Sequence, residues 1–167
     1  LQQDLTQLHE QAERLQELIK RLQQPEAAAD DGSAAIFGAG KQQLGWPVDG
    51  VVLIGFGTQK DRELGTYYES NGIEIGIPPG TAIRAVADGK VVFADWFKGY
   101  GNLLILSHPG GYHTLYAQAA RLDKTLGERV EAGTVLGQSG LSGRDSIYFE
   151  IRHNGSPVDP LQWLRHR

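Results

Sequence analysis

The stretch G-I-E-I-G-I-P-P-G-T-A-I-R-A-V-A-D-G-K-V-V-F-A, residues 72–94, contains short β-branched runs separated by P-P-G and A-D-G. β-Branched residues favour strands, and proline, glycine and aspartate favour the turns between them. The same punctuation continues through V-V-L-I-G-F-G, N-L-L-I-L-S-H, H-T-L-Y-A, V-L-G-Q and S-I-Y-F-E-I-R. The pattern predicts a mainly β fold, an antiparallel β-sheet domain over residues 46–167.

The N-terminal segment has a different period. Apolar residues recur at alternating spacings of four and three: Leu1, Leu5, Leu8, Ala12, Leu15, Ile19 and Leu22. This spacing keeps one seam facing a partner helix, and Pro25 cannot continue the helix. Residues 1–24 are therefore predicted to be the end of an α-helical coiled coil. The alternative is an amphipathic helix packed on its own domain.

Residues 25–45 are small, polar and interrupted by glycine, which is typical of a linker. Ile36 and Phe37 are the residues that suit docking, so the segment has a second interpretation as a regulatory element. If the chain before Trp46 folds back, Ile36 and Phe37 would occupy a groove of the domain.

Composition excludes several classes. A net charge of −4 and a pI near 5.7 provide no basic footprint for nucleic acid. The absence of cysteine excludes disulfides, thiolate zinc sites and thiol nucleophiles. No apolar run approaches the roughly 20 residues that span a bilayer. Because residue 1 is not methionine, we expect a fragment of a longer product that lacks any signal peptide.

Four ordered blocks carry a family resemblance over about residues 46–164. They are residues 72–94, then G-Y-G-N-L-L-I-L-S-H-P-G-G-Y-H-T-L-Y-A-Q, G-E-R-V-E-A-G-T-V-L-G-Q-S-G and S-I-Y-F-E-I-R. This order closely resembles the LytM (M23) peptidase domain, a family of zinc endopeptidases that cut peptidoglycan cross-bridges. The resemblance implies a LytM/M23-like antiparallel β-sheet domain.

The resemblance also implies a degenerate active site. Active members bind zinc through H-x-G-I-D and the second histidine of H-L-H-F-E, and this chain has S-N-G-I-E and S-I-Y-F-E. Ser70 replaces the first histidine and Glu74 the aspartate, while Ser146 and Tyr148 replace the late pair. Gln118 replaces the remaining catalytic histidine. Serine and tyrosine hydroxyls are poor zinc ligands. We therefore expect no enzymatic activity, no metal and no cofactor.

Other histidines do not rebuild a site. His108 and His113 flank a P-G-G turn, His153 lies in the next turn and His9 in the predicted coiled coil. None has the spacing of a zinc motif, so each is interpreted as structural.

A coiled coil followed by a degenerate LytM domain resembles EnvC-type murein hydrolase activators, a resemblance that extends to A-D-W-F-K-G-Y-G and the C-terminal I-R-x-x-G-x-x-V-x-P-x-x-W-L. It implies a periplasmic protein that activates zinc-dependent cell-wall N-acetylmuramyl-L-alanine amidases during cell division. It also implies coupling of the coiled coil to an FtsEX-type division complex. Peptidoglycan is a further candidate partner.

A partner-binding groove is the physical expectation. Its predicted members have large contact areas or polar tips suited to interfaces: Asn71, Glu74, Tyr100, Gln118, Tyr148 and Arg152. The even spacing of Tyr148 and Arg152 places both on one sheet face. The alternative is that Tyr148 fills the vacated zinc cavity and Arg152 pairs with Glu150. The loop 96–100 is either a contact or a hairpin wall with Trp96 packed inward, and Trp46 and Trp163 are assigned to core closure.

Two alternative functions remain: a peptidoglycan-binding pseudoenzyme whose cleft holds peptide stems, and a residual metalloendopeptidase that uses Glu74.

Overall fold

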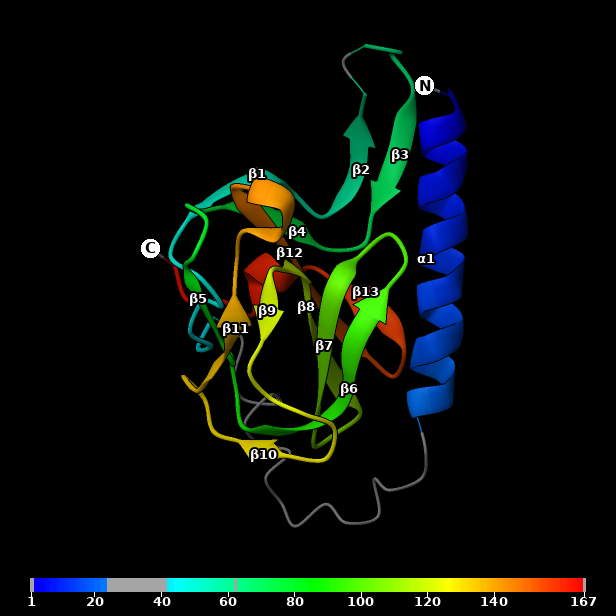
Figure 1. Ribbon diagram of the computed structural model, residues 1–167. Helices are drawn as coiled ribbons and strands as arrows, with labels where there is room; N and C mark the ends of the chain where they lie inside the picture. The colour runs from blue at the N-terminus through cyan, green and yellow to red at the C-terminus, as the bar shows by residue number, and fades with distance from the viewer. Residues whose placement is uncertain (1, 24–41, 62, 167) are drawn as a thin grey trace.

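The structure is a computed structural model that describes residues 2–23, 42–61 and 63–166. A single long helix, α1 (Gln2–Leu22), lies along one face of a large β-sheet (Figure 1). A smaller sheet lies beyond the other face, so the chain forms three layers. Among the described residues, no helix has the length and apolar character needed to cross a bilayer.

The large sheet has eight strands in the order β1-β4-β12-β8-β7-β6-β10, with β13 paired to β12. All of these pairings are antiparallel, as predicted. Its strands are β1 (Val51–Ile54), β4 (Ile73–Gly76), β6 (Gly89–Phe97), β7 (Gly101–His108), β8 (Tyr112–Ala119), β10 (Arg129–Val130), β12 (Ser146–His153) and β13 (Ser156–Val158).

Two smaller sheets complete the domain. One has the order β5-β11-β9 and consists of β5 (Ala82–Arg84), β9 (Arg121–Leu122) and β11 (Val135–Gln138). The other is a hairpin of β2 (Gly57–Lys60) and β3 (Tyr67–Ser70), which extends away from the rest of the domain (Figure 1). Short 3-10 turns occur at Leu141–Gly143 and Pro160–Gln162.

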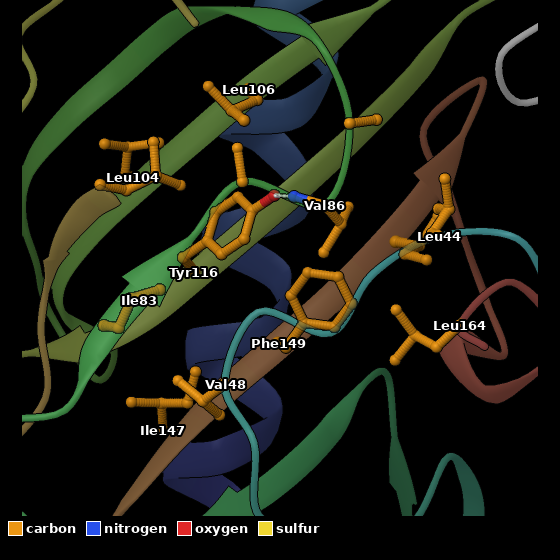
Figure 2. Packing of buried hydrophobic residues seen from close by; sticks show 14 of the residues in the cluster. Leu44, Val48, Ile83, Val86, Leu104, Leu106, Tyr116, Ile147, Phe149 and Leu164 are labelled. Atoms are coloured by element: carbon orange, nitrogen blue, oxygen red, sulfur yellow. Dashed lines mark hydrogen bonds between the residues drawn. The ribbon is translucent and has the colours of Figure 1, made fainter. Parts of the chain in front are cut away.

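The main core lies between the large sheet and the β5-β11-β9 sheet. Ile147, Phe149 and Ile151 project from β12 into this core, where Phe149 packs 5.3 Å from the ring centroid of Tyr116 (Figure 2). Because side chains alternate along a strand, the intervening residues of β12 project toward α1 instead. β12 is therefore covered on both faces.

A chain of buried polar groups crosses this core. Nδ1 of His108 lies 2.6 Å from the carbonyl oxygen of Asp88, and Nε2 lies 2.8 Å from the hydroxyl of Thr114. The Thr114 and Tyr116 hydroxyls lie 2.9 Å apart, and the Val86 amide donates to Tyr116 (Figure 2). Burial lowers the pKa of His108 from 6.5 to about 4. This histidine is structural, as expected.

The two ends of the domain are joined. Leu44 and Leu164 form a parallel bridge and are both buried. Trp163 is buried in the core, and Trp46 packs against the same core. Nε1 of Trp46 donates to the carbonyl oxygen of Arg165, 2.7 Å away. The assignment of both tryptophans to core closure therefore agrees with their positions.

The described part of the helical seam packs on the chain's own sheet. Leu15, Leu18 and Ile19 are buried against β7 and β8, which is the second arrangement that the sequence left open. The side chains of Leu5 and Leu8, and the segment with Ile36 and Phe37, lie outside the described residues. A coiled coil beyond this contact stays a prediction.

Acidification should destabilise the fold through His108. In the unfolded chain His108 is protonated near pH 6.5, and in the folded chain only near pH 4. The contribution of neutral His108 to stability is therefore fully present above about pH 6.5 and is lost as the pH falls toward 4. The free energy of unfolding should fall by about 3 kcal/mol through this histidine. Urea unfolding between pH 7.5 and 4 measures it. His108→Gln should make the profile shallower without flattening it, because burial also lowers the pKa of His113 to about 4. The exposed control His9→Asn should leave the profile unchanged. Equal slopes in all three proteins would contradict the assignment.

Candidate functional site

The site lies on the face of the large sheet that α1 covers. Tyr148 is in register with Glu74 of β4 on one side and with Ala117 of β8 on the other. Ser146 is in register with Gly76. The pairing of β4 with β12 thus brings the two blocks of the resemblance together, although they are more than 70 residues apart in sequence.

The hydroxyl groups of Ser70 and Tyr148, which the family resemblance places at zinc-ligand positions, already have partners within the chain. Ser70 is buried, and its hydroxyl donates to the carbonyl of Gly72 at 2.8 Å. The Tyr148 hydroxyl donates to Oε2 of Glu150 at 2.6 Å. Ser146 is also buried, whereas Glu74 is half-buried. Zinc requires imidazole, thiolate or carboxylate donors, and of these groups only Glu74 provides one.

Gln118 has an unusual backbone. Its φ is 67°, and it lies where the register between β7 and β8 shifts. Its backbone N–H donates to the carbonyl oxygen of Tyr100, and its side-chain Nε2 donates to the carbonyl oxygen of Gly99 at 3.2 Å. The left-handed conformation is costly for a residue with a side chain, and such strain concentrates at functional sites. Here it directs the carboxamide toward the β6–β7 turn.

A buried polar chain occupies the rest of this face. Glu150 and Arg152 have side chains that are 0% and 1% exposed, and Nε of Arg152 donates to Oε1 of Glu150 at 2.7 Å. Nη1 of Arg152 donates to Oε1 of Gln16 in α1 at 2.6 Å. Burial, and then the charge of Glu150, raises the pKa of Tyr148 well above its ordinary value. The hydroxyl of Tyr148 therefore stays protonated and serves as a donor.

This arrangement realises the alternative in which Arg152 pairs with Glu150. Both Tyr148 and Arg152 project toward the α1 face, as their even spacing predicted, but here α1 and the polar chain cover them. Their role in binding a partner stays a prediction.

An apolar cluster lies under α1. Leu15, Leu18 and Ile19 pack against Leu103, Ile105, Leu115 and Ala117 of β7 and β8. Burying a leucine or isoleucine side chain contributes about 1.5–3 kcal/mol, so these contacts give α1 most of its attachment. The helix also passes so close to Gly99 that a Cβ there would lie 2.3 Å from Cδ of Gln11. A side chain at this turn, where φ is +90°, would displace the side chain of Gln11 and strain the backbone.

Aromatic rings continue the cluster toward the β6–β7 turn. The ring centroids of Tyr100 and Tyr148 are 5.9 Å apart, and those of Phe97 and Tyr100 are 6.0 Å apart. Burial raises the pKa of Tyr100. Trp96 is 58% exposed, so the interpretation that it packs inward is wrong. The loop leaves Trp96 accessible and directs Phe97 and Tyr100 toward α1.

Of the remaining predicted residues, Asn71 is half-buried in the bend before β4. Sequence reasoning missed Gln16, which occupies a polar position of the heptad, and it gave His113 no role at the site. His113 is buried in register with Arg152. The cross-strand pairing of His113 with Arg152 is what places His113 at the site. This pairing follows from the strand register, which the sequence alone does not provide.

Within the described residues, no three histidine, cysteine, aspartate or glutamate side chains gather closely enough to hold a metal ion. Ser70 and Tyr148 do not fit zinc, because their hydroxyl groups are neutral and already bonded. The site is therefore a face of the large sheet that contains a buried polar chain and is covered by a helix.

Comparison with known proteins agrees with this class. The profile of peptidase family M23 matches residues 68–160. The chain belongs to peptidase family M23, the LytM domain family.

Two curated relatives and one solved structure illustrate the similarity. The murein hydrolase activator EnvC of Escherichia coli is 40% identical over 130 residues, which cover 76% of this chain and 30% of EnvC. The murein hydrolase activator NlpD of Salmonella typhimurium is 37% identical over 125 residues, 73% of this chain and 31% of NlpD. The crystal structure of a zinc-containing peptidase from Vibrio cholerae matches with a TM-score of 0.66 and 25% identity, covering 75% of this chain and 41% of that one. The chain thus spans about a third of the length of these curated relatives.

Removing the Tyr148 hydroxyl should destabilise the domain. Tyr148→Phe leaves Oε2 of the buried Glu150 without its donor, a loss of about 1–3 kcal/mol. Tyr67→Phe is the matched control, because Tyr67 is 67% exposed and should change stability by less than about 0.5 kcal/mol. Urea unfolding of both variants measures the difference. A loss no larger than the control's would show that the hydroxyl is unimportant to Glu150.

Proposed function

We propose that this protein is a non-catalytic activator of periplasmic cell-wall N-acetylmuramyl-L-alanine amidases, which split peptidoglycan during cell division. The observation that carries the proposal is an M23 fold in which the positions that the family resemblance assigns to zinc ligands hold Ser70 and Tyr148, and the position that it assigns to a catalytic histidine holds Ser146. A fold that keeps its groove without the catalyst is suited to binding. The names of EnvC and NlpD, murein hydrolase activators, support the same function.

The amidase would bind through the groove face of β4, β12 and β8. This face has an apolar floor of Leu103, Ile105 and Leu115, flanked by the aromatic rings of Tyr100 and Tyr148. α1 contacts the floor with side chains at helical spacing, which supports an amphipathic helix as the docking segment of the partner.

In this proposal α1 is an intramolecular competitor. The partner and α1 use the same floor, so each excludes the other, and the effective concentration of the tethered helix favours the closed form. The earlier hypothesis gave this role to Ile36 and Phe37, which lie outside the described residues. Coupling of the helical segment to an FtsEX-type complex would then supply the force or contact that removes α1.

The peptidoglycan-binding pseudoenzyme and the residual metalloendopeptidase remain alternatives. Titration with muropeptides separates the first from an amidase activator. Metal content after chelation tests the second, because a retained zinc ion would require ligands beyond Glu74.

Release of dye from labelled peptidoglycan tests the proposal directly. The protein alone and a cognate zinc amidase alone should release little, and the mixture should release much more. Tyr148→Ala should abolish the gain, whereas Tyr67→Ala on the exposed hairpin should retain it, with circular dichroism confirming that both variants fold. Release by the protein alone would mean that it is a peptidase.

Weakening the attachment of α1 to the sheet should increase activation of the amidase. Ile19→Ala removes a fully buried contact, worth about 2–5 kcal/mol, and leaves the groove residues intact. We expect a several-fold lower protein concentration at half-maximal activation, and a similar gain when residues 1–23 are deleted. Glu13→Ala on the exposed side of α1 is the control. Unchanged activation in Ile19→Ala and in the deletion would remove α1 as a competitor.

A further inference from the structure

Basic residues form a row across the large sheet on the α1 face. Arg129 of β10 is in register with Lys90 of β6, Lys90 with Ser107 of β7, Ser107 with His113 of β8, and His113 with Arg152 of β12. Directly opposed residues of antiparallel strands share a face, so all five point the same way. The row contains three permanent positive charges and no carboxylate.

The inner end of this row has unused polar atoms. Arg152 is 0% exposed and His113 is 4% exposed. Within the described part of the chain, Nη2 of Arg152 and both ring nitrogens of His113 have no hydrogen-bond partner. Buried polar atoms without partners are rare and costly, so their presence beneath a removable helix indicates a ligand other than the one now bound.

The present ligand is a neutral carboxamide. Oε1 of Gln16 accepts from Nη1 of Arg152, and Nε2 of Gln16 donates to the Gly155 carbonyl at 3.3 Å. Glu150 is the acidic neighbour of Arg152, and both of its oxygens already accept, one from Arg152 and one from Tyr148. Nη1 of Arg152 also donates to the Gly155 carbonyl at 3.2 Å, so the donor capacity that Gln16 leaves unfilled is that of Nη2.

We propose that Arg152 and His113 form a carboxylate-binding site for an acidic side chain on the partner's docking helix, and that Gln16 is a weaker neutral substitute in the closed form. The inference rests on the proposed function, because it assigns a chemistry to the partner of the same groove.

Two physical reasons favour a carboxylate over the carboxamide. A carboxylate has two oxygens that match the paired Nη1 and Nη2 donors of a guanidinium, and charge-assisted bonds are about twice as strong as neutral ones. Lys90 and Arg129 add a longer-range attraction for negative charge along the row. A partner helix with glutamate or aspartate at this point would therefore displace α1 even though α1 is tethered.

The protein itself provides the probe. Gln16→Glu places a carboxylate against Arg152 without changing the length of the side chain. We expect native-state hydrogen exchange of the α1 amides to slow about tenfold, since a tenfold change is 1.4 kcal/mol. Gln11→Glu is the matched control, because it adds the same charge to α1 beside Gly99, at the far end of the groove. Both are made in a Lys20→Gln background, which removes the local pair between residues 16 and 20.

Slower exchange in Gln16→Glu than in Gln11→Glu would support the carboxylate site. Equal or faster exchange would overturn it, and neither result depends on an amidase. Activation by the same variants then tests the proposed function separately. Weaker activation by Gln16→Glu supports the competition, whereas unchanged activation with slower exchange keeps the carboxylate site and counts against α1 as the competitor.

Discussion

The ion pair between Glu150 and Arg152 is the constraint on which the arrangement of this face depends. Both side chains are almost fully buried, and a buried charge is costly unless it is paired and hydrogen-bonded. Tyr148 supplies one further donor to Glu150, and Gln16 supplies an acceptor to Arg152. The strand that holds the pair and the helix that covers it are thereby connected through four side chains. Lifting α1 exposes Arg152 to water or to another acceptor.

The strands and their turns were predictable because each is a local feature: β-branched runs separated by proline and glycine. The common face of Tyr148 and Arg152 followed from strand periodicity alone. Neither the contact of Arg152 with Gln16 nor the buried position of His113 was predictable, because both depend on which elements become neighbours. β3 was missed as a strand because Y-Y-E-S has little apolar character and pairs only within its own hairpin.

The helical seam shows a different limit of sequence reasoning. Spacings of four and three specify an apolar face, but an apolar face packs equally well on another helix or on a sheet. Here Leu15 and Ile19 face Leu103, Ile105 and Leu115, and the polar positions next to them lie within reach of the sheet edge. Gln16 and Gln23 lie beside Gly155 in the β12–β13 turn, where the absence of a side chain leaves room for both. Uncharged glutamines make contacts there that are specific in geometry yet modest in strength.

The side chains that the family resemblance places at catalytic positions bond within the chain. Gln118 has a left-handed backbone that costs of the order of 1 kcal/mol, and its side chain bonds to the neighbouring turn. Ser70 and Tyr148 likewise donate within the chain and not to a ligand. With these groups satisfied internally, the hydrogen-bonding capacity left on this face is concentrated at Arg152 and His113. A surface with an apolar floor and one unsatisfied cationic end can recognise a helix by register as well as by hydrophobicity, because the acidic residue and the apolar anchors must fit together.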